Sequence, residues 1–381
     1  MSLFQNRMFS LRMLVFLCGT LAFLLSVVIA GAQQPSPPPP PPKAETQPAP
    51  SERTPGGIKP PMAKPTPSDD DNDDNYDVVR VNSNLVVVPV SVTDAAGQPV
   101  LGLTTTDFRL EEEGRAQEIA QIGDPEQVPL DIAILFDVSL SVEARFDFEK
   151  EAAARFLKQV MKAGDRATVF TIGTNPRLEQ PLDNSERVAA RIASLKPAKG
   201  ATAFYDTVVE AARYLAQNTP GSHRRVIVVI SDGEDTYSDK IKAAIGATPQ
   251  ERDSVRLDDR LKIHNRVILE VQREVQKAEI AFYSINPSGE ALKLNVISKR
   301  AEEGMEQLAA ATGGTSFVPE KLESLAAVFS QIAAELRSQY LLQYYSNDES
   351  PSGKFLRIKV GVPARPQLRI RARQGYYTKR K

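Results

Sequence analysis

Two apolar runs organise this chain, and each of them leads into an acidic residue. The first, LDIAILF, begins at Leu130 and leads directly into Asp137. The second, VIVVI, begins at Val226 and leads through one serine into Asp232. Runs rich in β-branched and large aliphatic residues are typical of central strands that are buried on both faces of a parallel sheet. The sequence therefore predicts two such strands with polar groups at their carboxyl ends.

Strand and helix patterns alternate around these two runs. Helical periodicity is found at residues 146–161, 185–195, 207–216, 305–311 and 322–338, and further strands are predicted at 166–172, 280–285 and 315–318. This alternation is the βαβ pattern of a doubly wound, mostly parallel, Rossmann-like sheet. Ligands of such sheets bind beyond the carboxyl ends of the strands, where Asp137 and Asp232 are expected.

One connection in this region is longer than the link we expect between neighbouring strands. Residues 237–277 carry many charges, and from residue 253 onward their apolar positions indicate an amphipathic helix. Because this insertion leaves from beside Asp232, it is a candidate lid or recognition surface. The alternative is a longer surface helix with no role, since loop insertions are well tolerated.

Both flanks of the α/β region have the pattern of β-strands. Residues 84–94 alternate as a half-buried strand does, and Pro89 indicates that this strand lies at an edge. One face of it carries Val86, Val88, Val90 and Val92. Further strands are predicted at residues 108–112, 116–122, 339–345, 355–362 and 367–372. We therefore predict one small β-sandwich built from residues 78–126 and 339–381, with the α/β domain of residues 127–338 inserted between them.

The N-terminus has the features of an exported protein. Basic residues precede an apolar stretch at residues 13–30, and Ala30-Gly31-Ala32 fits the small-x-small cleavage site of secretory signals. We predict a signal peptide at residues 1–32, no membrane span after its cleavage, and a secreted, periplasmic or cell-envelope location. An uncleaved anchor is the alternative, because the apolar stretch approaches the length of a spanning helix.

Composition narrows the function classes. The proline-rich and acidic residues 33–77 are predicted to form a disordered linker. The single cysteine, Cys18, lies in the predicted signal, so the mature chain would have no disulfide, no cysteine-ligated zinc and no cysteine nucleophile. The formal net charge of −1 gives no electrostatic case for nucleic-acid binding. The basic residues 369–381 are predicted to form a solvated terminal strand.

No catalytic machinery is recognisable in the sequence. The chain has only two histidines, His223 and His264, and both are predicted to be isolated surface residues. A Walker-type glycine loop, which would cradle the phosphates of a nucleotide, is missing from the sequence. We therefore predict that the protein is not an enzyme.

Oxygen-bearing side chains gather where the first buried strand ends. Asp137, Ser139 and Ser141 occupy alternate positions there, and carboxylate and hydroxyl oxygens are the ligands that Mg²⁺ and Ca²⁺ prefer. On these residues alone, an ordinary strand end followed by a capping serine is the alternative. Two further residues favour the metal site: Thr202 stands in a small-residue loop before a helical pattern, and Asp232 ends the second apolar run.

This set of residues resembles the metal-ion-dependent adhesion site of the von Willebrand factor type A (VWFA) domain. That site has the pattern Asp-x-Ser-x-Ser, then a distant Thr and a distant Asp. All five positions are filled here, by Asp137, Ser139, Ser141, Thr202 and Asp232. The stretches NLVVVPVSVTDAAGQPVLGLTTTDFRLEEEG and RIRARQGYY also resemble the flanks of the bacterial VWFA-related domain proteins, so the resemblance covers residues 78–378. It implies that the five residues bind Mg²⁺, or Mn²⁺ or Ca²⁺ in its place.

The expected function follows from the charge of this site. Two carboxylates and three neutral hydroxyls leave a divalent cation short of anionic ligands, so a carboxylate from another macromolecule would complete its shell. We expect a metal-dependent adhesion or interaction module that captures an acidic side chain of a protein partner. Glu234, Asp235 and Asp206 are candidates only for an outer shell. The alternative is a structural component of the cell envelope in which the metal only stabilises the fold, and the sequence does not predict the oligomeric state.

Overall fold

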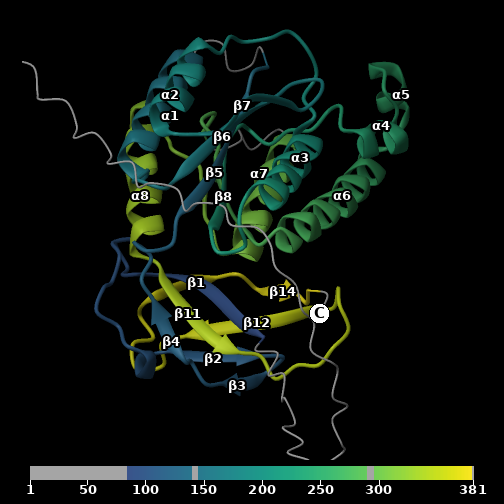
Figure 1. Ribbon diagram of the computed structural model, residues 1–381. Helices are drawn as coiled ribbons and strands as arrows, with labels where there is room; N and C mark the ends of the chain where they lie inside the picture. Colours follow the sequence, from purple (N-terminus) through teal and green to yellow (C-terminus); the bar gives the residue numbers. More distant parts are fainter. Residues whose placement is uncertain (1–83, 140–144, 290–295, 380–381) are drawn as a thin grey trace, which may run out of the picture. The chain divides into compact units, whose positions relative to one another are not determined.

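A computed structural model describes residues 84–139, 145–289 and 296–379 (Figure 1). The predicted signal peptide, the predicted linker and Ser141 lie outside these residues, and the predictions that concern them stay predictions. Within the described ranges, no helix combines the length and the apolar character that a membrane span requires.

A six-stranded sheet forms the centre of the α/β region. Its strands are, in spatial order, β10 (Ser316–Phe317), β9 (Ile280–Ile285), β8 (Arg224–Ile230), β5 (Leu130–Asp137), β6 (Arg166–Ile172) and β7 (Arg177–Asp183). Neighbouring strands pair in parallel except β6 and β7, which are antiparallel. The predicted doubly wound, mostly parallel sheet is thus confirmed.

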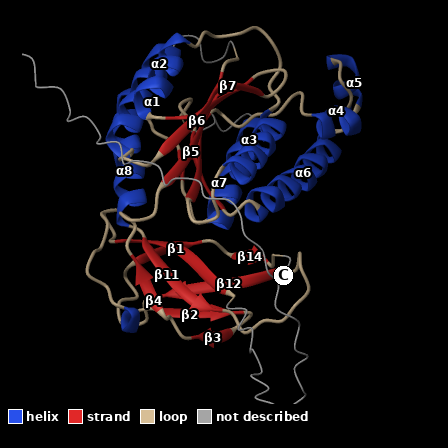
Figure 2. Ribbon diagram, in the orientation of Figure 1, coloured by secondary structure: helices blue, strands red, loops and turns tan. Residues whose placement is uncertain are grey.

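Helices cover both faces of this sheet (Figure 2). One face packs against α1 (Phe146–Val160), α2 (Ser185–Ser194) and α8 (Leu325–Ser338), the last preceded by the short 3-10 helix η3 (Leu322–Ser324). The other face packs against α3 (Phe204–Asn218), α4 (Asp239–Ile245), α6 (Leu257–Lys277) and α7 (Val296–Thr312), and α5 (Pro249–Ser254) lies between α4 and α6 in the chain.

The central strand β5 contributes to the cores on both faces. All of its residues are buried, and successive side chains of a strand point to opposite faces of the sheet. Ile134 and Phe136 therefore join the core under α1 and α8, whereas Ala133 and Leu135 join the core under α3 and α7. This double burial explains why the sequence of β5 is a nearly continuous apolar run.

Strands from the two flanks of the chain build two antiparallel sheets. The first has the order β13 (Arg369–Ala372), β1 (Leu85–Thr93), β11 (Tyr340–Tyr345) and β4 (Gln121–Gly123). The second has the order β14 (Gly375–Tyr377), β12 (Phe355–Gly361), β2 (Arg109–Glu112) and β3 (Arg115–Gln117), and the 3-10 helix η1 (Thr105–Asp107) precedes β2. Both sheets share one core, to which Val88, Leu110, Leu342 and Leu356 belong. The predicted β-sandwich formed by both flanks is confirmed.

Arg224 joins the two chain segments that connect the α/β region to the sandwich. Its Nη2 donates to the carbonyl of Pro125 (2.9 Å), which follows β4, and its Nη1 donates to the carbonyl of Leu336 (2.8 Å), near the end of α8. Nη1 also donates to Oε1 of Gln339 (3.2 Å). Burial lowers the pKa of Arg224 to about 10, so the side chain is still charged at neutral pH. One buried cation therefore holds the entry and the exit of the inserted region together.

Two predictions for the N-terminal flank were wrong. β1 is not an edge strand, because it lies between β11 and β13. Pro89 is tolerated since the stretch paired with β13 begins only at Val90, so no N–H of residue 89 is needed there. Residues 116–122 do not form one strand: they are divided between β3 and β4, which belong to different sheets.

The structure differs from the sequence predictions at three further places, where the apolar pattern of the chain is weak. β7 is not among the predicted strands; it lies at the edge of the sheet, and its residues are only partly buried or exposed. The predicted helix from residue 253 is interrupted, since α5 ends at Ser254 and α6 begins at Leu257. The chain end is more ordered than a solvated strand, because β14 pairs with β12 and its Tyr376 is buried in the sandwich core.

Candidate functional site

The described members of the predicted metal site come from loops at the carboxyl edge of the central sheet. Asp137 is the last residue of β5, and Asp232 follows the end of β8. Because β5 and β8 are parallel neighbours, with Phe136 opposite Ile230, both acidic residues lie at the same edge. Ser139 lies two residues after the end of β5, while Ser141 lies outside the described residues.

Asp137 is fixed in place by two hydrogen bonds. Its side chain is buried, its Oδ1 accepts from the backbone N–H of Ser139 (2.9 Å), and its Oδ2 accepts from the hydroxyl of Ser231 (2.9 Å). The Ser231 hydroxyl in turn accepts from the N–H of Gly233 (3.0 Å). Ser231 was not predicted as a site residue, yet it connects the ends of β5 and β8. Its position directly after the second apolar run is the signal that could have identified it.

The loop that carries Asp232 depends on a glycine. Oδ1 of Asp232 accepts from the N–H of Glu234 (3.1 Å), and between them Gly233 has a φ of 76°. A Cβ atom at Gly233 would lie 2.8 Å from Cε of Met305. Both the positive φ and this close approach require glycine. Gly233 therefore sets the path of the loop that holds Asp232 in place.

Thr202 is held at the same edge by two neighbouring loops. Its N–H donates to Oγ1 of Thr236 (3.1 Å), and its carbonyl accepts from the N–H of Thr236 (2.9 Å), in the loop after β8. The next residue, Ala203, donates its N–H to the carbonyl of Gly173 (2.7 Å), which follows β6. The structure therefore brings the loop of Thr202 to the ends of β6 and β8, as a shared site requires.

The two acidic residues of the site interact unfavourably with each other. Burial is the main cause that raises the pKa of Asp232 to about 6, and the negative charge of Asp137 raises it further. The hydrogen bond from Glu234 and the more distant charge of Arg145 only partly oppose this effect. Among the described residues, neither Asp137 nor Asp232 forms an ion pair with a lysine or arginine. Asp137 and Asp232 therefore have no direct cationic partner among the described residues, although the charge of Arg145 acts on Asp232 from a distance.

Glu149 is a third buried acid that was not predicted. Its Oε1 accepts from Nε of Arg145 (2.9 Å), whereas its buried Oε2 has no hydrogen-bond partner within the described residues. Burial raises the pKa of Glu149 to about 7; Arg145 opposes this, and the charges of Asp137 and Asp232 add to it. Glu149 lies on the face of α1 that carries Phe146, so helical spacing could have identified it as a buried acid.

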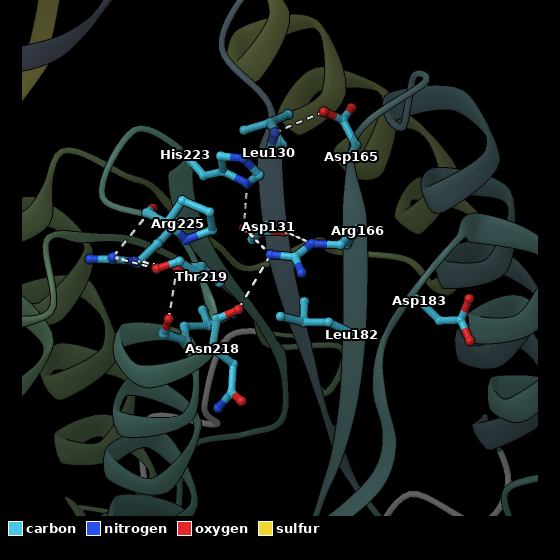
Figure 3. A network of polar contacts seen from close by, with 12 residues as sticks. Leu130, Asp131, Asp165, Arg166, Leu182, Asp183, Asn218, Thr219, His223 and Arg225 are labelled. Carbon is cyan, nitrogen blue, oxygen red and sulfur yellow. Dashed lines mark hydrogen bonds and ion pairs between the residues drawn. The ribbon is translucent and has the colours of Figure 1, made fainter. Parts of the chain in front are cut away.

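The opposite edge of the same strands shows how buried acids are normally compensated in this fold. Asp131, at the start of β5, accepts from Nε (2.8 Å) and Nη2 (2.9 Å) of Arg166, and it lies 2.7 Å from Nδ1 of His223 (Figure 3). Asp165 forms an ion pair with Arg337. At the amino edge these buried acids are thus paired with cations, whereas at the carboxyl edge only Glu149 has such a partner, and Asp137 and Asp232 have none among the described residues.

The prediction of isolated surface histidines was wrong. His223 is partly buried and contacts Asp131 at the amino edge, far along the strand from Asp137. His264 is also partly buried, and its Nδ1 lies 3.3 Å from the hydroxyl of Tyr205. Burial is the main cause that lowers the pKa of His264 to about 4, so this imidazole is neutral at physiological pH.

The three candidates for an outer shell have other partners. Asp235 accepts from the backbone N–H groups of Tyr205 (2.8 Å) and Ser238 (2.9 Å), and Asp206 accepts from the N–H of Asp239 (2.8 Å). Glu234 accepts a hydrogen bond from the hydroxyl of Ser298. Asp206 and Asp235 therefore fix the start of the insertion against α3.

The residues present suit a hard divalent cation. They offer two carboxylates and at least two hydroxyls, which are the oxygen ligands that Mg²⁺ and Ca²⁺ prefer. Burial and the charge of Asp137 both disfavour the ionised form of Asp232, and a bound cation would offset that cost. No three Asp, Glu, His or Cys residues form a metal-holding group in the part of the chain that the structure describes. A cation here would therefore depend on hydroxyl oxygens.

Comparison with known proteins agrees with this geometry. Residues 132–234 match the family model of the von Willebrand factor type A domain. This match begins in β5 and ends just beyond Asp232, so it contains the whole predicted site and confirms the resemblance seen in the sequence. The comparison with curated proteins gives no match.

Several solved structures are similar in fold. The PilB minor pilin from Streptococcus sanguinis is 16% identical with a TM-score of 0.41, over 56% of this chain and 62% of that chain. A von Willebrand factor type A protein from Catenulispora acidiphila is 15% identical with a TM-score of 0.41, over 68% and 51%. The von Willebrand domain of the type V pili tip protein Mfa5 from Porphyromonas gingivalis is 16% identical with a TM-score of 0.40, over 54% and 94%. The alignments with the first two span less than two thirds of those proteins.

Proposed function

We propose that this chain, which contains a von Willebrand factor type A domain, is an exported module that binds a protein partner through a divalent cation. The type A domain supports the general role in protein interaction. The cation, the acidic group on the partner and the export are our inferences from the residues of this chain.

One observation carries the metal dependence. Asp137 and Asp232 meet at the carboxyl edge of the sheet without an ion pair to a lysine or arginine in the described part of the chain, and the pKa of Asp232 is raised to about 6. The same strands pair their buried acids with arginine at the opposite edge. Negative charge that is left uncompensated at one edge is a natural place for a cation.

Asp137, Asp232, Ser139, Ser141 and Thr202 would hold the cation. Mg²⁺ is the preferred ion, and Mn²⁺ or Ca²⁺ would satisfy the same donors. When bound, it would supply the positive charge that attracts a carboxylate of the partner. Ser231 orients the carboxylate of Asp137, and Gly233 sets the path of the loop that carries Asp232. The loop of Thr202 is tied to the loops after β6 and β8, so it can respond when the site is occupied.

Metal binding is tested first, by calorimetric titration with Mg²⁺ and Mn²⁺. We expect binding by the native chain and none by Asp137→Ala, with the fold retained because the sheet supplies most of the core. The control is Asp147→Asn, on the exposed face of α1. Unchanged affinity in Asp137→Ala would remove Asp137 from the site.

Partner recognition is tested next, with paired peptides that differ only by Asp against Asn or Glu against Gln. We expect capture that requires both Mg²⁺ and the carboxylate, and that falls in Thr202→Ala while the melting transition changes little. If EDTA leaves partner capture unchanged but strongly lowers the melting temperature, the metal only stabilises the fold. The correct function is then that of a structural component of the cell envelope. Mass analysis of the mature N-terminus tests export: cleavage after Ala32 is the expected result.

A further inference from the structure

A pocket of about 150 Å³ lies beside the metal site but outside it. Its walls come from the loop after β8, from the insertion helices α4, α5 and α6, and from α7. Gly233 and Thr236 of the loop line it, whereas Asp137 and Thr202 do not. The insertion thus encloses a space that has no part in holding the cation.

Most of the pocket wall is apolar. Ile241 and Ile245 of α4 form a buried part of it, and Leu261 continues it on α6. Leu257 and Ile297 also line the pocket, although each is 40% exposed. Exposed large apolar residues around an apolar hollow favour an apolar ligand group. A volume of about 150 Å³ is enough for one benzene ring.

Positive side chains also line this apolar space. Arg260 of α6 and Arg300 of α7 both line the pocket, and the charges of both lower the pKa of His264, another lining residue. Nε of Arg260 is buried and has no hydrogen-bond partner within the described residues, and its ion pair with Asp253 is long, at 3.8 Å. The long contact with Asp253 leaves the outer guanidinium nitrogens of Arg260, rather than its buried Nε, as the donors for another acceptor.

The acidic residues of the pocket lining are already engaged. Asp235 accepts hydrogen bonds from Tyr205 and Ser238, and Glu234 accepts one from Ser298. His264 is neutral, so it can offer a hydrogen bond without adding charge. Arg252 also lines the pocket, but its Nη1 donates to the carbonyls of Thr236 and Ala247. Arg300 donates from Nε to Asn265 and from Nη1 to Glu303 (2.6 Å), so an anion in the pocket would meet Arg260 first and compete with Glu303 for Arg300. Arginine is well suited to this role because its planar donors match the geometry of a carboxylate.

We propose that this pocket binds a small free carboxylic acid with an apolar body of about the size of one aromatic ring. The ring lies between Ile241, Ile245 and Leu261, and the carboxylate accepts hydrogen bonds from Arg260 and Arg300. This binding site needs no cation, and its ligand is separate from the acidic side chain of the protein partner.

The test uses benzoate as the probe, with the full mature chain in EDTA, so that the metal site cannot contribute. Saturation-transfer NMR and calorimetric titration are carried out with benzoate, with benzyl alcohol, which has the ring but no charge, and with acetate, which has the charge but no ring. We expect benzoate to bind at least about tenfold more tightly than either, since a hydrogen bond to a charged group contributes about 1.5 kcal/mol or more.

Three substitutions then locate the site. Arg260→Gln and Arg300→Gln should each weaken benzoate about tenfold, while Arg260→Lys should retain part of the affinity because it keeps the charge. Arg266→Gln is the matched control, since Arg266 is an exposed arginine of the same helix that does not line the pocket. Benzoate affinity that is unchanged in the Arg260→Gln, Arg300→Gln double variant would overturn the proposal. So would equal binding of benzoate and benzyl alcohol, or no benzoate binding by the native chain.

Discussion

Replacing Asp232 with asparagine should stabilise the metal-free protein and at the same time remove its response to metal. The carboxyl of Asp232 has an ordinary pKa of 3.8, and burial together with Asp137 raises it to about 6 in the fold. Between these values the folded chain keeps a proton that the unfolded chain has released, so the free energy of unfolding falls as the pH rises. Below about pH 4 both states are protonated and this cost is absent.

The size of the effect follows from that change in pKa. Each pKa unit corresponds to about 1.4 kcal/mol, so the raised pKa of Asp232 lowers the free energy of unfolding by roughly 3 kcal/mol above pH 6. Because Asp232 is partly exposed, solvent screening reduces the expected gain to about 2 kcal/mol. Asparagine keeps an oxygen that can accept from the N–H of Glu234, so the loop loses little. Removal of the Asp232 charge also lessens its repulsion of the Glu149 carboxylate, and this too stabilises the metal-free fold.

Urea unfolding in EDTA, followed from about pH 4 to about pH 8, measures this difference. Asp232→Asn should equal the native chain near pH 4 and exceed it by about 2 kcal/mol at pH 8. Asp147→Asn, on an exposed helix face, should change stability by less than about 1 kcal/mol at every pH. With Mg²⁺ at about 100 times its Kd the order should reverse, because only the native chain gains about 2.7 kcal/mol. A metal-free Asp232→Asn protein that is less stable than the native chain at pH 8 would refute the reasoning.

Three further predictions concern the framework. Asp131→Ala should lower the free energy of unfolding by about 3 kcal/mol in urea at neutral pH, because it leaves Arg166 without its buried partner; a loss below about 1 kcal/mol would contradict a structural role for this pair. Arg224→Met should destabilise the chain by about 3 kcal/mol, since the carbonyls of Pro125 and Leu336 lose their donor. The control, Arg213→Met on the exposed face of α3, should change the stability by less than about 1 kcal/mol. A chain that ends at Ser338 should aggregate in size-exclusion chromatography, because β1 would lose both β11 and β13; a monomer with unchanged thermal stability would disprove the shared sandwich.

The parts of the fold that the sequence predicts well are those with a strong pattern. β5 and β8 are buried on both faces, so their apolar runs identify them at once. β1 alternates: four of its five valines face the sandwich core, and the fifth, Val87, is exposed. β7 was missed because an edge strand with partly exposed residues carries no such pattern. Residues 116–122 misled the prediction because no local signal marks where a chain leaves one sheet for another.

The site was predictable where a motif spans it and unpredictable where tertiary packing creates it. Asp137, Thr202 and Asp232 follow from the type A pattern, and the topology brings their loops together. Ser231 and Glu149 have no place in that pattern, although both are buried next to it. The pairing of His223 with Asp131 joins residues from separate segments of the chain, and the sequence around neither residue predicts the contact. Contacts of this kind arise only from the packed sheet.

The pairing of β1 with β11 has a consequence for how the chain acquires its structure. Val88 finds its partner Leu342 only after nearly the whole chain has been made. Closing a loop of roughly 250 flexible residues costs about 5 kcal/mol in entropy. Once the inserted region has folded, Arg224 holds its two ends together and most of that loop no longer has to be closed. Folding of the inserted region therefore lowers the entropy cost of completing the outer sandwich, and until β11 and β13 are paired β1 presents exposed strand edges that favour aggregation.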